Sequence, residues 1–195
     1  MTNARQTFDQ LYDQHLEAIF RYVLRRVANV AEAEDLTAQT FYKALRRFWR
    51  FRWSGGNASA WLYRIATNEV NTHYRSQQTS SRVDPATVTT GRNDAEKELA
   101  VQRLYLDLHR ALRRLDPNDQ ALIVLRYFEQ KPYDEIAPIL RSRPGTLAMR
   151  ANRALKKLKN ELHQRGIDHE ELRGILAPAE RPRLSGRDIP AQAAP

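Results

Sequence analysis

The sequence YDEIAPILRSRPGTLAMRANRALKKLK, residues 133–159, decides the fold of the C-terminal half of this chain. Apolar residues at helical spacing predict a short support helix over 133–140, a turn over 141–143, and a second helix that begins at Pro144. The second helix is rich in Arg and Lys. Two helices joined by a tight turn, with cations on the second, are typical of a helix-turn-helix whose second helix enters the major groove of DNA.

The apolar residues of both helices are expected to face a common core. This inward set is Ile136, Ala137, Leu140, Leu147, Ala151, Ala154 and Leu158. Ala137 is small enough to let two helices cross closely. Pro138 lacks a backbone N–H and is expected to kink or tighten the support helix.

The other residues of the second helix are left for DNA. The candidates for reading bases are Thr146, Ala148, Met149, Arg150, Asn152 and Arg153. Arg reads guanine and Asn reads adenine, each through a pair of hydrogen bonds. Lys156 and Lys157 are expected to contact phosphates, which adds affinity without sequence information. The alternative is a solvated basic face on an ordinary helical hairpin.

A second basic segment, FYKALRRFWRFRW at residues 41–53, interleaves aromatic rings with cations and contains no acid. Such a pattern suits single-stranded DNA, because rings stack on bases while cations follow the phosphates. The candidate contacts here and downstream are Trp49, Arg50, Arg52, Trp53, Asn57, Arg64, Asn68, Asn71 and Arg75. Phe41 and Phe48 are assigned to the core, whereas Trp49 and Trp53 fit either a core or a base-stacking role.

Helical spacing recurs in nearly every apolar stretch, so the predicted fold class is all-α. We expect two small helical domains, 8–76 and 94–165, joined by a flexible linker over 77–93, with a mostly disordered tail over 166–195. Asn57 is a candidate N-cap. Asp116-Pro117 is expected to start a helix, with Asp as the cap and Pro at the first helical position.

Composition narrows the function further. The chain has 195 residues and a net charge of +9, and this charge suits a polyanionic partner. It contains no Cys, which excludes disulfides and thiolate metal sites. No apolar run is long enough to span a bilayer, and the N-terminus has no signal-peptide core. The His residues show no metal spacing and no catalytic motif occurs, so we expect neither a cofactor nor an enzyme.

Glu32, Glu34 and Asp35 form an acidic patch at the start of an expected helix. Acids there are favoured by the helix dipole, and on the residues alone this is the preferred interpretation. A docking surface for a basic partner is the alternative.

In combination, these segments resemble a bacterial sigma factor of the extracytoplasmic-function (ECF) group over residues 8–164. AEDLTAQTFYKAL at 33–45 looks like the family's polymerase-docking helix, and FRW…AWLYRIATN…YR at 51–75 resembles the segment that melts and reads the −10 element. The helix-turn-helix, with LDPNDQALIVLRYF before it, resembles the domain that reads the −35 element. The order of the segments, with a linker between them, is more specific than any single motif.

The resemblance implies a cytoplasmic promoter-recognition subunit without catalytic activity. Its implied partners are the clamp helices and flap of core RNA polymerase, promoter DNA and an anti-sigma factor. Asp35, Leu36 and Gln39 would contact the clamp helices. Arg64 and Asn68, with the loop at 54–58, would hold bases of the non-template strand. Thr146, Arg150 and Arg153 match the recognition helix.

The chain departs from the family pattern at Ala148 and Met149, where Lys or Arg followed by Ser is common. The tail after Gly166 also exceeds the minimal architecture; a regulatory element, an anti-sigma contact and disorder are the alternatives. A stand-alone helix-turn-helix regulator is the alternative function, although it leaves the segments at 33–45 and 41–53 unexplained. A nuclease would need a carboxylate or His cluster that the sequence does not show.

Overall fold

The computed structural model describes residues 2–48, 57–79 and 95–167, and all regular structure in these ranges is helical, as predicted. The elements are α1 (Thr2–Val27), α2 (Val30–Phe48), α3 (Ala58–Thr79), α4 (Ala95–Leu112), α5 (Pro117–Ile123), the π-helical turn η1 (Val124–Phe128), α6 (Tyr133–Leu140) and α7 (Pro144–His163). We call residues 2–79 the N-terminal half and residues 95–167 the C-terminal half.

Two helices of the N-terminal half, α2 and α3, begin at polar caps that the sequence supplies. Asn29 accepts a hydrogen bond from the backbone N–H of Glu32 at 3.1 Å at the start of α2. Asn57 accepts one from the N–H of Ala60 at 3.2 Å, which confirms the predicted cap of α3. These side chains satisfy N–H groups that have no partner inside the helix. The three helices then pack around buried residues such as Ile19 and Leu62.

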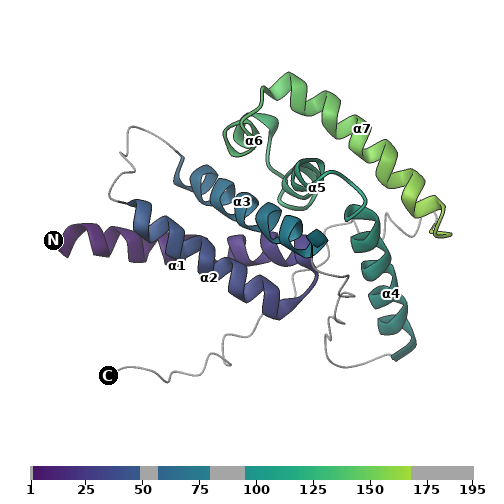
Figure 1. Ribbon diagram of the computed structural model, residues 1–195, viewed down its shortest axis with the longest axis horizontal. Coiled ribbons are helices and arrows are strands. Elements are labelled where there is room, and N and C mark those ends of the chain that lie inside the picture. The colour runs from purple at the N-terminus through teal and green to yellow at the C-terminus, as the bar shows by residue number, and fades with distance from the viewer. Residues whose placement is uncertain (1, 49–56, 80–94, 168–195) are drawn as a thin grey trace.

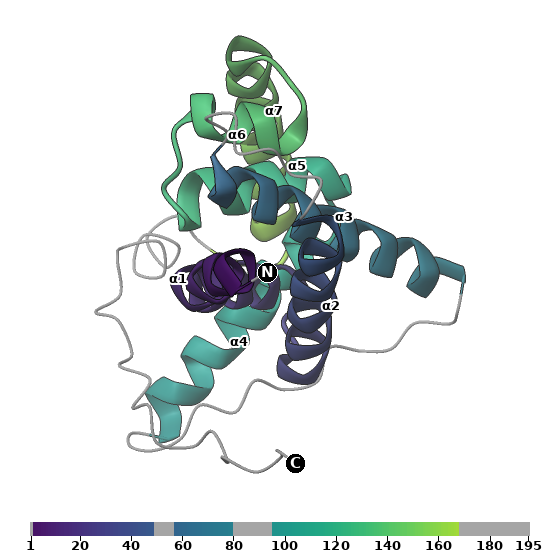
Figure 2. The same cartoon turned by 90° about the vertical axis from the view of Figure 1, so that its left-hand side faces the viewer.

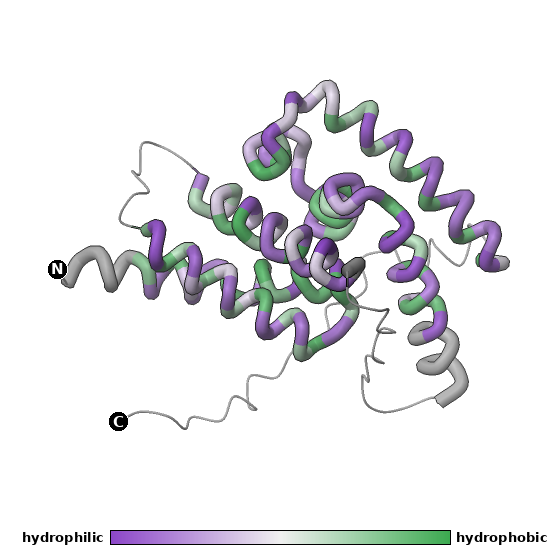
Figure 3. Tube along the Cα trace, viewed as in Figure 1, coloured by the Kyte–Doolittle hydropathy of each residue, from purple (hydrophilic) through white to green (hydrophobic). Residues whose placement is uncertain are grey.

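The C-terminal half contains the predicted helix-turn-helix. Asp116 caps α5 by accepting from the N–H of Asn118 at 2.9 Å, and Pro117 occupies the first turn, as expected. The support helix α6 ends at Arg141, which adopts the left-handed conformation with φ 51°. Helix α7 follows, and Figure 3 shows hydrophobic and hydrophilic residues alternating along it. Four predicted inward residues of α7 are buried: Leu147, Ala151, Ala154 and Leu158.

Packing of α6 differs in detail from the prediction. Ile136 is fully buried, but Ala137 and Leu140 are only partly buried against the core. Ile139, which the sequence analysis did not select, is buried instead. Because α6 is short and crosses two helices, its inward face is wider than one regular stripe.

The two halves share one hydrophobic core, which the prediction of two separate small cores did not include. Residues of α5, η1, α6 and α7, such as Leu122 and Ile136, belong to the same buried cluster as Leu62 and Val70 of α3. Figures 1 and 2 show α5, α6 and α7 stacked over the layer formed by α1, α2 and α3. A second, smaller cluster lies among α4, α5 and α7 and includes Ile167.

Several expectations fall outside the described residues. The predicted linker, 77–93, overlaps α3 up to Thr79, and the remainder lies outside. So does the tail from residue 168 onward. The division into domains at 8–76 and 94–165 therefore stays a prediction.

Candidate functional site

The outer face of α7 presents most of the residues proposed for DNA. Six of the eight are exposed: Thr146, Met149, Asn152, Arg153, Lys156 and Lys157. Ala148 and Arg150 are half-buried. The exposed set combines cations, an amide and an apolar side chain on one helix face, which is a chemistry that fits a major groove.

Arg150 is held by an acid of the neighbouring helix α5. Its Nη2 and Nε donate to Asp119 Oδ1 at 2.6 and 3.1 Å. Asp119 is also an acid in the first turn of α5. Because its carboxylate binds one edge of the guanidinium, it fixes where the free edge of Arg150 points.

The α2 surface is exposed at Asp35 and Gln39, two of the three residues proposed for polymerase. Leu36 is 4% exposed and belongs to the core, so it supports this surface from below rather than forming part of it. Tyr42 and Leu45 are 60% and 44% exposed on the same helix.

Glu32 of the acidic patch has partners inside the N-terminal half. Its carboxylate lies 3.1 Å from His73 Nε2 and also accepts from Gln77. Glu34 and Asp35 are exposed. The patch that remains available to a partner is therefore narrower than the sequence indicated.

The residues proposed for the −10 element are divided. Asn68 and Arg75 of α3 are exposed and Arg64 is half-buried, whereas Asn57 is exposed but caps the helix. Asn71 is only 6% exposed. Trp49, Arg50, Arg52 and Trp53 lie outside the described residues.

Asn71 is buried because its amide joins the two halves. Its Oδ1 accepts from Arg26 at 2.9 Å, and its Nδ2 donates to Asn118 of α5 at 3.1 Å. A side chain with both ends occupied cannot bind DNA in this arrangement. The assignment of Asn71 to a DNA surface is thus not met by the geometry described here.

Arg26 is a functional candidate that the sequence analysis missed. It is fully buried at the end of α1, at the meeting point of α1, α3 and α5. The sequence carries a signal for it: Arg26 follows Ile19, Tyr22 and Val23 at helical spacing, so a charge lies on the buried stripe.

A second polar contact between the halves centres on Glu129. Its carboxylate pairs with Arg25 and accepts from the Tyr63 hydroxyl at 3.2 Å. Lys131 Nζ lies 4.7 Å from the centre of the Tyr63 ring. Burial, followed by the charge of Glu129, raises the pKa of Tyr63. The hydroxyl therefore stays protonated at neutral pH and donates its hydrogen bond to Glu129.

Within the described residues no group of His, Asp and Glu side chains is arranged to hold a metal ion. The same residues include no helix that is both long enough and apolar enough to cross a membrane.

Comparison with protein families gives two matches in the order that the sequence suggested. Residues 11–80 match Sigma-70 region 2, and residues 105–158 match Sigma-70, region 4. The first match covers α2 and α3, and the second contains the helix-turn-helix.

Curated relatives agree with these matches. The chain is 36% identical over 160 residues to the ECF RNA polymerase sigma factor BldN of Streptomyces coelicolor, with 77% of this chain and 60% of that protein aligned. It is 31% identical to the ECF sigma factor SigE of Mycolicibacterium smegmatis, covering 63% of that protein. The chain thus spans somewhat less than two thirds of these two relatives. The RNA polymerase sigma factor YlaC of Bacillus subtilis is 32% identical, and 92% of its length is covered by 78% of this chain.

Among solved structures, the fold is similar to that of the sigma factor RpoE in its complex with the anti-sigma factor NepR from Bartonella quintana. The TM-score is 0.62 at 24% identity, over 81% of this chain and 98% of that chain. The likeness extends to both halves of the fold. With both regions matched in order and a relative aligned over nearly its whole length, the chain belongs to the ECF group of RNA polymerase sigma factors.

Proposed function

We propose that this chain binds core RNA polymerase and directs it to specific promoters. The observation that carries the proposal is the presence, in one chain and in the family's order, of a region 2 with exposed acids near the start of α2 and a region 4 whose helix α7 has an exposed basic face. A stand-alone DNA-binding protein would have no use for the first of these surfaces.

Each surface has a role in this proposal. The exposed residues of α2, with Asp35 and Gln39, dock on the clamp helices of the largest polymerase subunit. Arg64 and Asn68 of α3 contribute to recognition and melting of the −10 element, together with the aromatic and basic segment before it. The outer face of α7 reads the −35 element, and the polymerase flap binds the same half of the chain.

The proposal assigns no catalytic residue to this chain, because the polymerase supplies the chemistry of RNA synthesis. It locates the protein in the cytoplasm, where promoter DNA and polymerase are found. An anti-sigma factor is a proposed regulator, since the structurally similar RpoE was solved with one bound.

The first test is co-elution of the purified chain with bacterial core RNA polymerase at near-physiological salt. Asp35→Lys reverses a charge on the docking helix without disturbing the core. We expect it to weaken polymerase binding by about tenfold or more, because opposed charges at an interface become like charges.

Asp13→Lys is the matched control, since Asp13 is also an exposed acid and lies on α1. It should bind like the unaltered chain. Equal binding by all three proteins would remove the docking assignment from Asp35. Failure of the folded, unaltered chain to co-elute would instead favour a stand-alone helix-turn-helix regulator.

A further inference from the structure

Arg26 brings hydrogen-bond acceptors from both halves onto one guanidinium group. From the N-terminal half, the Tyr22 hydroxyl lies at 3.3 Å and Asn71 Oδ1 at 2.9 Å. From the C-terminal half, Gln120 Oε1 and the Pro117 carbonyl both lie 3.0 Å from Nη2. Within the described part of the chain, no carboxylate forms an ion pair with this buried side chain.

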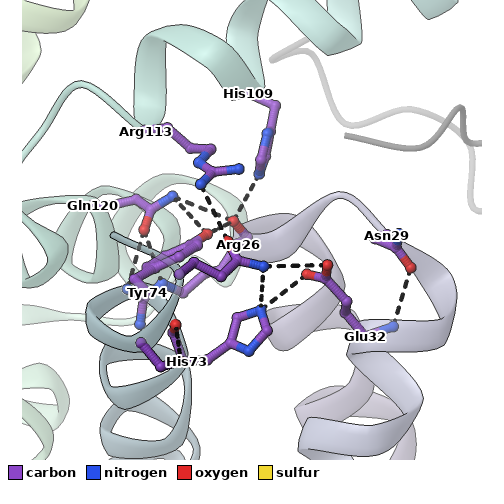
Figure 4. Close-up of polar contacts among 10 residues, drawn as sticks. Arg26, Asn29, Glu32, His73, Tyr74, His109, Arg113 and Gln120 are labelled. Carbon is purple, nitrogen blue, oxygen red and sulfur yellow. Dashed lines mark hydrogen bonds and ion pairs between the residues drawn. The ribbon is translucent and has the colours of Figure 1, made fainter. Parts of the chain in front are cut away.

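The backbone carbonyl of Arg26 is a second meeting point. It accepts hydrogen bonds from the Tyr74 hydroxyl of α3, from His109 Nε2 of α4 at 2.7 Å and from Gln120 Nε2 of α5 at 3.3 Å. Figure 4 shows His109, Arg113 and Gln120 converging on Arg26 and Tyr74. One residue of α1 therefore connects α3 with both α4 and α5.

The chemistry of this cluster suits a contact that opens. A buried guanidinium loses its hydration, and neutral acceptors offset that loss less completely than a carboxylate does. If the halves separate, water can replace Gln120 and Pro117 as acceptors. Hydration of the charge thus favours separation, whereas the hydrogen bonds that Arg26 makes to both halves and the shared apolar core favour contact.

The closed arrangement does not suit promoter binding. Elements centred at −10 and −35 are roughly 25 base pairs apart, which is roughly 80 Å at the spacing of bases along DNA. A compact chain of this length has a radius of gyration of only about 16 Å. In addition, Asn71, which the sequence analysis placed among the −10 contacts, is occupied by Asn118 of the other half.

We propose that Arg26 and its partners form an intramolecular latch that holds region 4 against region 2, so that the free protein rests in a closed state and must open to occupy both promoter elements. The link to promoter binding rests on the proposed function. The closed state of the free chain, and its dependence on the latch, does not.

The test measures the distance between the halves in the full-length free chain. The chain has no Cys, so Asp13→Cys and Asn160→Cys provide unique sites for two spin labels on exposed positions of α1 and α7. Gln120→Leu removes an acceptor and a donor from the latch at similar volume. Double electron–electron resonance should then show a population with long distances about ten times larger than in the labelled chain that retains Gln120. This factor is expected because the variant loses hydrogen bonds to a charged group.

Asn118→Ala is a second variant that does not touch the core, because Asn118 is exposed and its cap contact with Asp116 uses only backbone. It should also enlarge the population with long distances, by a smaller factor than Gln120→Leu. If Gln120→Leu fails to fold, this variant alone tests the latch. Asp107→Asn, which breaks ion pairs only within the C-terminal half, is the matched control and should leave the distances unchanged.

Two results would overturn the latch: distances that are the same in the unaltered chain and in both variants, or a free chain that is already open. If opening is required for polymerase, the released variants should also bind core enzyme more tightly, by up to the factor by which the open population rises. A variant that opens but does not bind polymerase would contradict the proposed function while still supporting the latch.

Discussion

At the scale of single residues, Asp119 shows how an acid can orient Arg150, the cation that we propose reads a base. It occupies Nε and one hydrogen of Nη2 of Arg150, which leaves the hydrogens on Nη1 and the second hydrogen on Nη2. These remaining donors form a fork that can meet the two acceptors on the major-groove edge of guanine. Asp119 therefore acts as a positioning residue for Arg150.

Arg150→Ala should reduce binding to the cognate −35 sequence by about 1–3 kcal/mol and relax preference at one base pair. Arg150→Lys should not restore the preference, because an ammonium group lacks the planar fork. Binding to a panel of single-base −35 variants measures both effects. Lys157→Ala is the comparison, since a phosphate contact should weaken binding to all sequences alike. The same uniform loss with Arg150→Ala would make Arg150 a phosphate contact as well.

Residue roles could be predicted from the sequence only where a type of side chain and its helix face sufficed. The outward face of α7 is an example, because four buried residues at helical spacing fix its direction. Leu36 is one of the apolar residues at helical spacing in α2, and its burial agrees with that spacing rather than with the polymerase contact that the resemblance implied. Asn71 could not be placed in this way, because it is buried by a helix that follows α3 by many residues in the sequence.

At the scale of elements, α6 carries an internal defect. Pro138 lies inside the helix and cannot donate to the carbonyl of Asp134, four residues earlier. The helix is nonetheless held at its ends. The N–H of Ile136 bonds the Pro132 carbonyl at 3.1 Å, and the N–H of Ser142 bonds the Ala137 carbonyl at 3.1 Å. Packing of Ile136 and Ile139 thus stabilises a helix whose sequence alone is unfavourable.

Pro138→Ala should raise the free energy of unfolding by about 1–2 kcal/mol. The substitution restores a missing helix hydrogen bond, and the greater freedom of the unfolded chain offsets only part of that gain. Urea unfolding followed by circular dichroism measures the change. Pro144→Ala is the matched control: Pro144 is at the first position of α7, where Pro costs nothing, so this variant should be slightly less stable. Equal effects of the two substitutions would show that Pro138 is not a defect.

Element boundaries were predictable where caps are local. Asn57 and Asp116 each bond an N–H within three residues, so neighbouring sequence is enough to define the start of the helix. The π-helical turn η1 was not predictable in the same way. It continues the apolar spacing of α5, and its wider turn depends on what packs around it.

At the scale of the whole molecule, helical periodicity identifies an apolar face but not what covers it. Two stripes that each predict a small core can equally well combine into one, and here Leu62 and Ile136 belong to the same cluster. Arg26 was the available sign, because a charge on a buried stripe needs partners from elsewhere. Whether the two halves stay in contact or separate therefore depends on a balance: packing of the shared core favours contact, and hydration of Arg26 favours separation.

His109 should make that balance depend on pH. It is 2% exposed, its Nε2 donates to the Arg26 carbonyl, and within the described residues its buried Nδ1 has no partner. The pKa of His109 is lowered from 6.5 to about 4; burial is the main cause and the charge of Arg113 adds to it, while the hydrogen bond to the Arg26 carbonyl and the charge of Glu32 oppose the shift. A second proton would fall on the unpartnered Nδ1. Opening lets water reach this nitrogen.

Because the pKa of His109 is lower in the closed state, the open state binds the extra proton. The contribution of neutral His109 to the stability of the closed state is therefore fully present above pH 6.5. It is lost progressively as the pH falls toward about 4. A shift of this size corresponds to at most about 3 kcal/mol. Spin-label distances recorded from pH 7.5 downward should show the open population rising by about tenfold for each unit of pH below 6.5.

His109→Gln keeps a donor for the Arg26 carbonyl but does not titrate in this range. It should flatten most of the pH dependence of the distances, while leaving the smaller contribution of His15, whose pKa is lowered by burial and then by Lys131 across the interface. The difference between the two proteins isolates His109. Identical pH profiles for the unaltered chain and His109→Gln would mean that proton uptake at this site is not linked to opening.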